Sequence, residues 1–272
     1  MDNPIKDRKS IKLMQFMYPM TVLIQICETF ADISTYKEFK SLFLNKHMTK
    51  AQPELQDTLP KLMKRDTPVT EQEVLQVYFE SFEKQTAENI EVFLQRLLNQ
   101  NFVILWSYFE SYLDHVLEAI LWKENHVLYD LSKQNIISKK NEVKLDIILD
   151  HESKDAMLEA IIGDIMENHS RLSASKKIRV HHDIGIPVER YFDFSQIDDT
   201  KFRFPEIIRL GGKYFETMET FRNDIVHKLQ MPLANFTDLD KTFEYLFWLV
   251  RNISLIIHDK FDIPIDVLPV QE

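Results

Sequence analysis

The chain has 272 residues, of which 44% are hydrophobic and 28% are charged, an ordinary composition for a globular protein with one large or two small domains. Four glycines and a single cysteine, Cys27, exclude glycine-rich phosphate loops, an internal disulfide framework and a cysteine zinc cluster. The net charge of −10 argues against broad, non-specific coating of nucleic acid, but it leaves room for a small basic site. The lone cysteine suits a reducing compartment, so we expect a cytoplasmic protein.

Residues 1–85 predict an N-terminal helical extension. Apolar residues from Met14 to Phe30 recur at helical spacing, with a bend or break expected at Pro19. The longest uncharged run, Leu13 to Cys27, is shorter than the roughly 20 residues that a membrane span needs, so we expect no membrane insertion. Residues 52–68 turn polar and contain three prolines, which makes them the best candidate for a linker.

Residues 88–122 predict a long helix. Apolar side chains recur in steps of three and four from Leu94 to Ile120. No charged residue occurs from Phe102 to Phe109, so the helix is apolar nearly all round in this stretch. Such a helix is buried on several sides, as the central helix of an α-bundle is. Its aromatic side chains are therefore interpreted as core residues.

Residues 123–210 predict shorter elements. We expect one or two short helices within 123–150, an amphipathic helix over 153–171 and an irregular segment over 183–212. Two adjacent histidines, His181 and His182, give only a weak metal signal, because neighbouring side chains rarely converge on one ion.

A basic segment runs from Arg171 to His182 without a single acidic residue. It has two interpretations. Lys176, Lys177 and Arg179 bind the phosphates of an RNA, or the segment is a solvated surface loop.

Two helices are predicted near the end of the chain. One begins at about Lys213 and ends before Pro232, because a proline disfavours helical geometry in the residue that precedes it. The other begins at the capping-box-like sequence Thr237-Asp-Leu-Asp240 and carries a buried stripe that reaches Ile257. An extended tail follows over 261–272.

The segment Phe221–Lys228 carries an arginine and a histidine five positions apart, Arg222 and His227, with polar Asn223 and Asp224 directly after the arginine. A guanidinium offers a fork of donors suited to phosphate. An imidazole donates and accepts protons near neutral pH. Five residues rotate by roughly 140° on a regular helix, so these side chains are not expected to meet on one straight helix. Convergence would need a loosened helix or a second copy of the motif across a two-fold axis.

Two less specific interpretations stay open. The segment at Arg222 is also what a helix C-terminus that happens to carry a histidine would look like. A second arginine–histidine pair, Arg251-Asn252 with His258, lies within the last predicted helix and is interpreted as a capping and surface feature.

The sequence Arg222-Asn223-Asp224-Ile225-Val226-His227 resembles the Arg-x-x-x-x-His signature of the HEPN superfamily. The aromatic helix around Phe102–Leu113 and the helix after the motif are similar in their order to HEPN ribonucleases of toxin and phage-defence systems. The resemblance covers roughly residues 88–260. It implies an all-α, HEPN-like helical bundle over 86–260, with a long insertion at about 123–210, between the N-terminal extension and the tail.

The resemblance further implies a metal-independent endoribonuclease that leaves a 2′,3′-cyclic phosphate and a 5′-hydroxyl. Arg222 would stabilise the phosphate in the transition state, His227 would act as general acid or base, and Asn223 would orient the arginine or the phosphate. Asp224 and Glu110 are auxiliary candidates. A homodimer, an RNA substrate and an antitoxin or defence-system partner are implied, with neither cofactor nor metal. The alternative is a non-catalytic HEPN-like dimerisation or RNA-binding module.

Overall fold

The computed structural model describes residues 10–31, 71–124, 126–128 and 153–265. Most of these residues lie in helices and none of them lies in a β-strand, which confirms the expected all-α class. One isolated parallel bridge pairs Ile11 with Ile265. The linker expected at 52–68 and most of the segment 123–150 lie outside the described residues.

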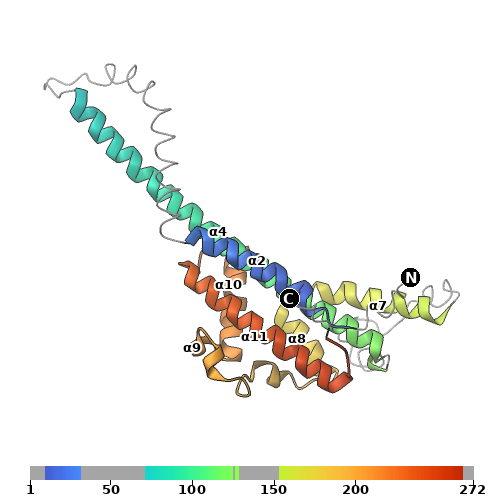
Figure 1. Ribbon diagram of the computed structural model, residues 1–272. Coiled ribbons are helices and arrows are strands. Elements are labelled where there is room, and N and C mark those ends of the chain that lie inside the picture. The colour runs from blue at the N-terminus through green and yellow to red at the C-terminus, as the bar shows by residue number, and fades with distance from the viewer. Residues whose placement is uncertain (1–9, 32–70, 125, 129–152, 266–272) are drawn as a thin grey trace, which may run out of the picture.

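The longest helix, α4 (Glu71–Lys123), forms the centre of the molecule, and its N-terminal part extends beyond the other described helices (Figure 1). It begins well before the predicted start at residue 88, because no glycine or proline interrupts the chain between residues 71 and 123. The boundary expected after residue 85 therefore lies inside one continuous helix.

The C-terminal half of α4 packs against several helices, as expected, but Ile104 within its uncharged stretch is 45% exposed, so the helix is not buried all round. The side chains of this half that are at most 1% exposed include Phe102, Leu105, Trp106, Phe109, Tyr112, Leu113, Val116, Leu117 and Ile120. Their positions advance in steps of one and three and so form one broad stripe along the helix, while Ile104, Ser107 and Ser111 on the opposite side are exposed. This stripe is stable only when other elements cover it.

Helices α2 (Leu13–Ala31) and α11 (Phe236–Phe261) cover one side of α4 and also pack against each other. The ring of Phe16 on α2 meets that of Tyr112 edge-on at 5.5 Å. The Tyr112 hydroxyl donates to the Val250 carbonyl at 3.0 Å and contacts Ser254 Oγ at 2.7 Å, both on α11. The N-terminal helix thus belongs to the same core as the last helix, and it continues through Pro19 without a break.

Three further helices complete the cover: α7 (Lys154–Ser170), α8 (Ala174–Asp183) and α10 (Gly212–Lys228). Two short 3-10 helices, η1 (Val188–Phe192) and η2 (Asp199–Lys201), and the one-turn helix α9 (Pro205–Ile208) link α8 to α10, in the region predicted to be irregular.

The basic segment folds as helix α8, so its interpretation as a solvated loop is wrong. The physical reason is that Ala174, Ile178 and Val180 are buried and anchor the segment to the core. Basic residues fill much of the remaining sequence, and this hid the apolar side of a short helix.

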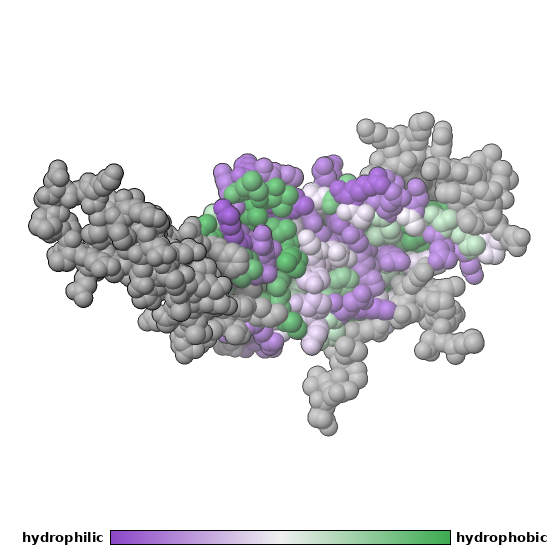
Figure 2. Space-filling model, turned by 90° about the horizontal axis from the view of Figure 1, so that it is seen from above, coloured by the Kyte–Doolittle hydropathy of each residue, from purple (hydrophilic) through white to green (hydrophobic). Residues whose placement is uncertain are grey.

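The surface mixes hydrophobic and hydrophilic side chains, and on the face seen in Figure 2 the hydrophobic ones gather in a band flanked by hydrophilic ones. Within the described ranges, no helix combines the length and the apolar character needed to cross a membrane.

We predict that Phe109→Ala lowers the free energy of unfolding by about 3–5 kcal/mol, because it leaves a cavity in the most deeply buried part of α4. Phe109 is 0% exposed and its ring lies 5.6 Å from that of Trp106 and 6.0 Å from that of Phe215. Urea unfolding followed by circular dichroism measures the change. Ser107→Ala, at an exposed position two residues away, is the matched control and should change the value by less than about 0.5 kcal/mol; equal losses would contradict the central role of α4.

Candidate functional site

Helix α10 carries the arginine–histidine motif and is held against α4 by aromatic contacts. Phe215 on its buried side lies 5.3 Å from Trp106, and Phe221 lies 6.5 Å from Phe102, measured between ring centroids. Arg222 follows Phe221 directly and is partly buried, whereas His227 in the last turn is exposed. The packing therefore presents the motif at the edge of the core rather than inside it.

The chain that leaves α10 is fixed to α4 by Asn99. The buried Asn99 amide donates to the Leu233 carbonyl at 3.0 Å and accepts the Leu233 N–H at 3.1 Å. Leu229 ends the helix in the left-handed conformation, with φ of 56°, and its N–H bonds to the Asp224 carbonyl. The last turn of α10 is thus constrained on both sides of His227.

Arg222 and His227 converge within a single chain. The Arg222 Nη1 atom lies 3.5 Å from His227 Nε2 and 3.3 Å from Asn223 Oδ1. The expectation that one helix keeps the pair apart is wrong. It considered only the angle between the two positions, whereas a long arginine side chain also reaches along the helix towards its end.

A guanidinium can only donate, so in this contact Nε2 is the acceptor. A separation of 3.5 Å is at the long limit for a hydrogen bond. Both groups can therefore turn to an anionic ligand, which the guanidinium binds more strongly than it binds a neutral nitrogen.

The remaining residues predicted for this site lie in different surroundings. Asn223 touches Arg222, whereas the Asp224 carboxylate pairs with Lys228 at 2.7 Å. The Glu110 carboxylate accepts from Trp106 Nε1 at 3.2 Å. Glu110 lies two turns beyond Phe102, the residue of α4 that touches α10 beside Arg222, or roughly 12 Å along the helix. The structure brings Asn223 to the pair and does not bring Glu110 to it.

The second arginine–histidine pair has a scaffold role, which confirms its interpretation as a capping and surface feature. The Asn252 amide donates to three carbonyls of the η1 segment, those of Arg190, Tyr191 and Asp193. His258 Nδ1 donates to the Ile263 carbonyl at 2.8 Å just after α11 ends.

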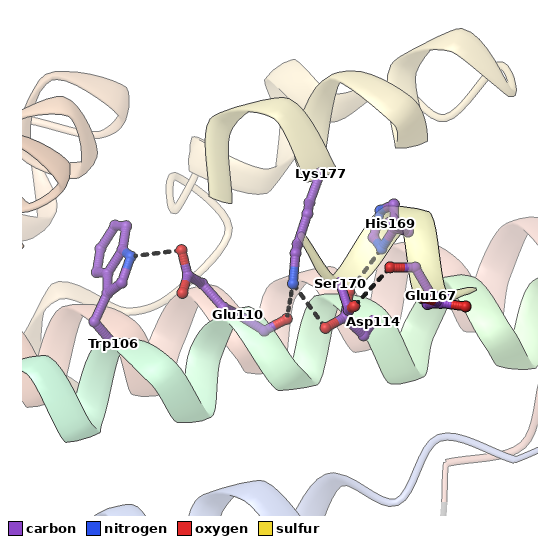
Figure 3. Close-up of polar contacts among 7 residues, drawn as sticks. All are labelled: Trp106, Glu110, Asp114, Glu167, His169, Ser170 and Lys177. Carbon is purple, nitrogen blue, oxygen red and sulfur yellow. Dashed lines mark hydrogen bonds and ion pairs between the residues drawn. The ribbon is translucent and has the colours of Figure 1, made fainter. Parts of the chain in front are cut away.

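A buried polar cluster joins α7 and α8 to α4 (Figure 3). The Asp114 carboxylate accepts from Lys177 Nζ at 2.7 Å and from His169 Nδ1 at 2.7 Å. Lys177 Nζ also donates to the Glu110 carbonyl at 3.2 Å. The side chain of Lys177 is 2% exposed, so the prediction that it binds RNA is wrong: its ammonium is enclosed and already paired. Lys176 and Arg179 are exposed.

Two more buried groups extend this cluster. His181 Nδ1 lies 3.1 Å from the Tyr191 hydroxyl, and its ring stacks on that of His169 at 6.3 Å. Burial is the main cause that lowers the pKa of His181 to about 3, and the positive charges of His169 and Lys177 add to it. Burial also raises the pKa of Tyr191 well above its ordinary value. Both side chains are therefore neutral at physiological pH.

The sequence held a signal for this cluster. Asp114 lies within a helix predicted to be buried on several sides, and a buried carboxylate requires a cationic or donor partner. The acid-free segment that begins at Arg171 was the obvious source of that partner, but the sequence did not show which of its cations would turn inwards.

Among the residues that the structure describes, no group of three or more His, Cys, Asp or Glu side chains is placed to hold a metal ion. Comparison of the chain with models of known protein families, with curated proteins and with solved structures finds no match.

Breaking the buried ion pair should be costly. We predict that Lys177→Met lowers the free energy of unfolding by about 1–3 kcal/mol, because it removes the cation from the Asp114 carboxylate, whose side chain is 22% exposed and keeps His169 as a partner. The double change Asp114→Asn/Lys177→Met should recover much of this loss, since the amide oxygen still accepts from His169. Lys176→Met is the exposed control. Urea denaturation of the wild type and the three variants measures the free energy of unfolding. A double variant that is less stable than Lys177→Met would contradict the prediction.

The stability of the protein should fall with acidification through His181. An unfolded histidine has a pKa near 6.5, and the folded pKa is about 3. Between these values the unfolded chain binds more protons, so the free energy of unfolding falls as the pH decreases, by up to about 1.4 kcal/mol per pH unit from this residue.

His181→Phe should remove this contribution. Its free energy of unfolding should therefore vary less steeply between pH 6.5 and 4.5 than that of the wild type. His182→Phe removes the exposed imidazole next to it and should leave the slope unchanged. Denaturation series at several pH values measure the slopes, and equal slopes for wild type and His181→Phe would contradict the assignment.

Proposed function

We propose that the protein is a metal-independent endoribonuclease of the HEPN type, with Arg222 and His227 as its catalytic pair. The observation that carries the proposal is the 3.5 Å approach of Arg222 Nη1 to His227 Nε2 at the end of α10. This contact places a permanent cation and a proton acceptor in the same surface position, beside an amide from Asn223. Those are two of the groups that cleavage of an RNA phosphodiester without a metal requires.

In the proposed reaction, a neutral His227 accepts the proton of a ribose 2′-hydroxyl, and the 2′-oxygen attacks the adjacent phosphorus. The bond from phosphorus to the 5′-oxygen breaks, and the departing oxygen takes up a proton from a general acid. The products are a 2′,3′-cyclic phosphate and a 5′-hydroxyl. The Arg222 guanidinium neutralises the charge that develops on the non-bridging oxygens, while Asn223 orients the guanidinium.

A homodimer is part of this proposal. One pair supplies one imidazole, whereas the reaction uses a base and an acid, so a second His227 across a two-fold axis would complete the site. Two apolar side chains beside the pair suit such a contact: Leu229 is 84% exposed and Val226 is 42% exposed. Large exposed apolar side chains next to one another favour a partner surface.

The arrangement of α4, α10 and α11 also supports a HEPN-like bundle, in which an aromatic helix precedes the motif helix and another helix follows it. On this proposal the protein acts in a toxin–antitoxin or phage-defence setting in the cytoplasm, and an antitoxin or defence protein regulates it.

The experiment uses single-stranded RNA in the presence of EDTA. We predict that wild-type protein cleaves the RNA and that Arg222→Ala/His227→Ala lowers the rate at least about 100-fold, the lower limit for the loss of acid–base catalysis. Product ends are identified by mass spectrometry as cyclic phosphates. Lys201→Ala/His126→Ala removes one cation and one imidazole from other exposed positions and should cleave like wild type.

No cleavage by wild type, or equal cleavage by wild type and Arg222→Ala/His227→Ala, would refute the enzyme. Binding of RNA by wild type without cleavage would instead favour the non-catalytic RNA-binding module.

A further inference from the structure

The exposed side of α8 carries two cations without carboxylate partners. Lys176 and Arg179 are both exposed, and neither forms an ion pair with any residue that the structure describes. Arg171, just before the helix, is instead paired with Glu167. In a chain with a net charge of −10, two adjacent cations left unpaired on one helix face are an unusual arrangement, because carboxylates are abundant.

Their outward direction is fixed by the core. Lys177 points from α8 into the buried cluster, where Asp114 and the Glu110 carbonyl hold its ammonium (Figure 3). Residues three apart on a helix lie on one side of it, so Lys176 and Arg179 together face away from this anchor. A rotation of α8 that turned them inwards would withdraw Lys177 from Asp114.

The same face of α8 is joined to the motif helix. The Glu219 carboxylate on α10 accepts the backbone N–H of Ser175 at 3.2 Å and also accepts its hydroxyl. Glu219 precedes Arg222 by three residues, a spacing that brings side chains on a helix within roughly 5–6 Å at their Cβ atoms. The start of α8, with Lys176 next to Ser175, is thus attached about one helical turn from Arg222.

This joint also engages the Glu219 carboxylate, although hydrogen bonds from a neutral serine do not cancel its charge. The Glu219 carboxylate lies between the two basic regions, but both of its oxygens are bound by Ser175. It forms an ion pair with neither Lys176 nor Arg222 among the described residues. The cations on both sides of the joint therefore remain available to an anion from solution.

We propose that Lys176 and Arg179 continue the Arg222 site as a track for the sugar–phosphate backbone of a single RNA strand. The inference rests on the proposed function. It specifies the substrate as a strand several nucleotides long, which spans α10 and α8, rather than a dinucleotide. The track binds through charge on phosphates, so it sets the position of the strand and contributes no base preference.

Binding is tested in a His227→Ala background, which prevents cleavage. The association constant of a fluorescent single-stranded 12-nucleotide RNA is measured by anisotropy over a series of salt concentrations. Loss of two phosphate contacts with a single strand should make the slope of log K against log salt shallower by about 1.4, at roughly 0.7 per contact. Lys176→Ala/Arg179→Ala should show this change, and the charge-conserving Lys176→Arg/Arg179→Lys should retain the original slope.

The matched control is Lys154→Ala/Lys201→Ala, which removes the same charge from exposed positions away from the track. It should leave the slope unchanged. Urea midpoints of all variants should agree, which confirms that the substitutions act on binding and not on folding.

Cleavage provides the second readout, with His227 intact. Lys176→Ala/Arg179→Ala should raise KM for the 12-nucleotide RNA while changing kcat less than twofold, and should leave cleavage of a dinucleotide unaffected. If wild type cleaves RNA but Lys176→Ala/Arg179→Ala matches the Lys154→Ala/Lys201→Ala control in slope and KM, the track is refuted while the proposed nuclease activity is supported. If wild type neither binds nor cleaves RNA, both proposals fail.

Discussion

The burial of α4 between Phe102 and Trp122 is the constraint on which the other described helices depend. Apolar side chains form a broad stripe along this stretch, and other helices have to cover the stripe if the chain is to fold. Helices α2 and α11 close one side, α10 another, and α7 with α8 a third. Asp114 is a carboxylate within this apolar stretch, and it is paired with Lys177 and His169. Because a buried charge is tolerated only with partners, one acidic residue fixes the positions of two covering helices.

The candidate site lies where this cover ends. Helix α10 leaves the core after Ile225, and Asn99 holds the following loop through two hydrogen bonds to Leu233. His227 therefore sits on a last helical turn that is restrained at the C-terminal end of α10, while its side chain remains exposed. A rigid support beneath an exposed pair is what a binding or catalytic site needs. It also explains how a chain with so acidic a composition can present a local cationic surface.

Much of the fold followed from pattern. The uncharged aromatic stretch around Trp106 predicted a buried central helix, and the apolar steps after Asp240 predicted the last helix; both are present. The sequence pattern did not predict helix α8. Its buried residues are few, and Lys177, which is expected at the surface from its charge, is enclosed in the core. The sequence pattern also placed a domain boundary after residue 85, whereas α4 continues through this position. Helical periodicity does not show whether two adjacent helical stretches join.

The sequence by itself determined the helical class, the buried character of the α4 centre and the identity of Arg222 and His227 as the residues of chemical interest. These depend on the order of side chains along a helix, which local geometry converts directly into faces. Tertiary structure decided that the pair meets within a single chain, that Lys177 turns inwards and that Lys176 and Arg179 turn outwards beside α10. Those outcomes depend on the reach of long side chains and on Asp114 and Glu219, which are 63 and 44 residues from their partners in α8. Separations of that size carry no periodic signal, so only the packed chain brings the groups together.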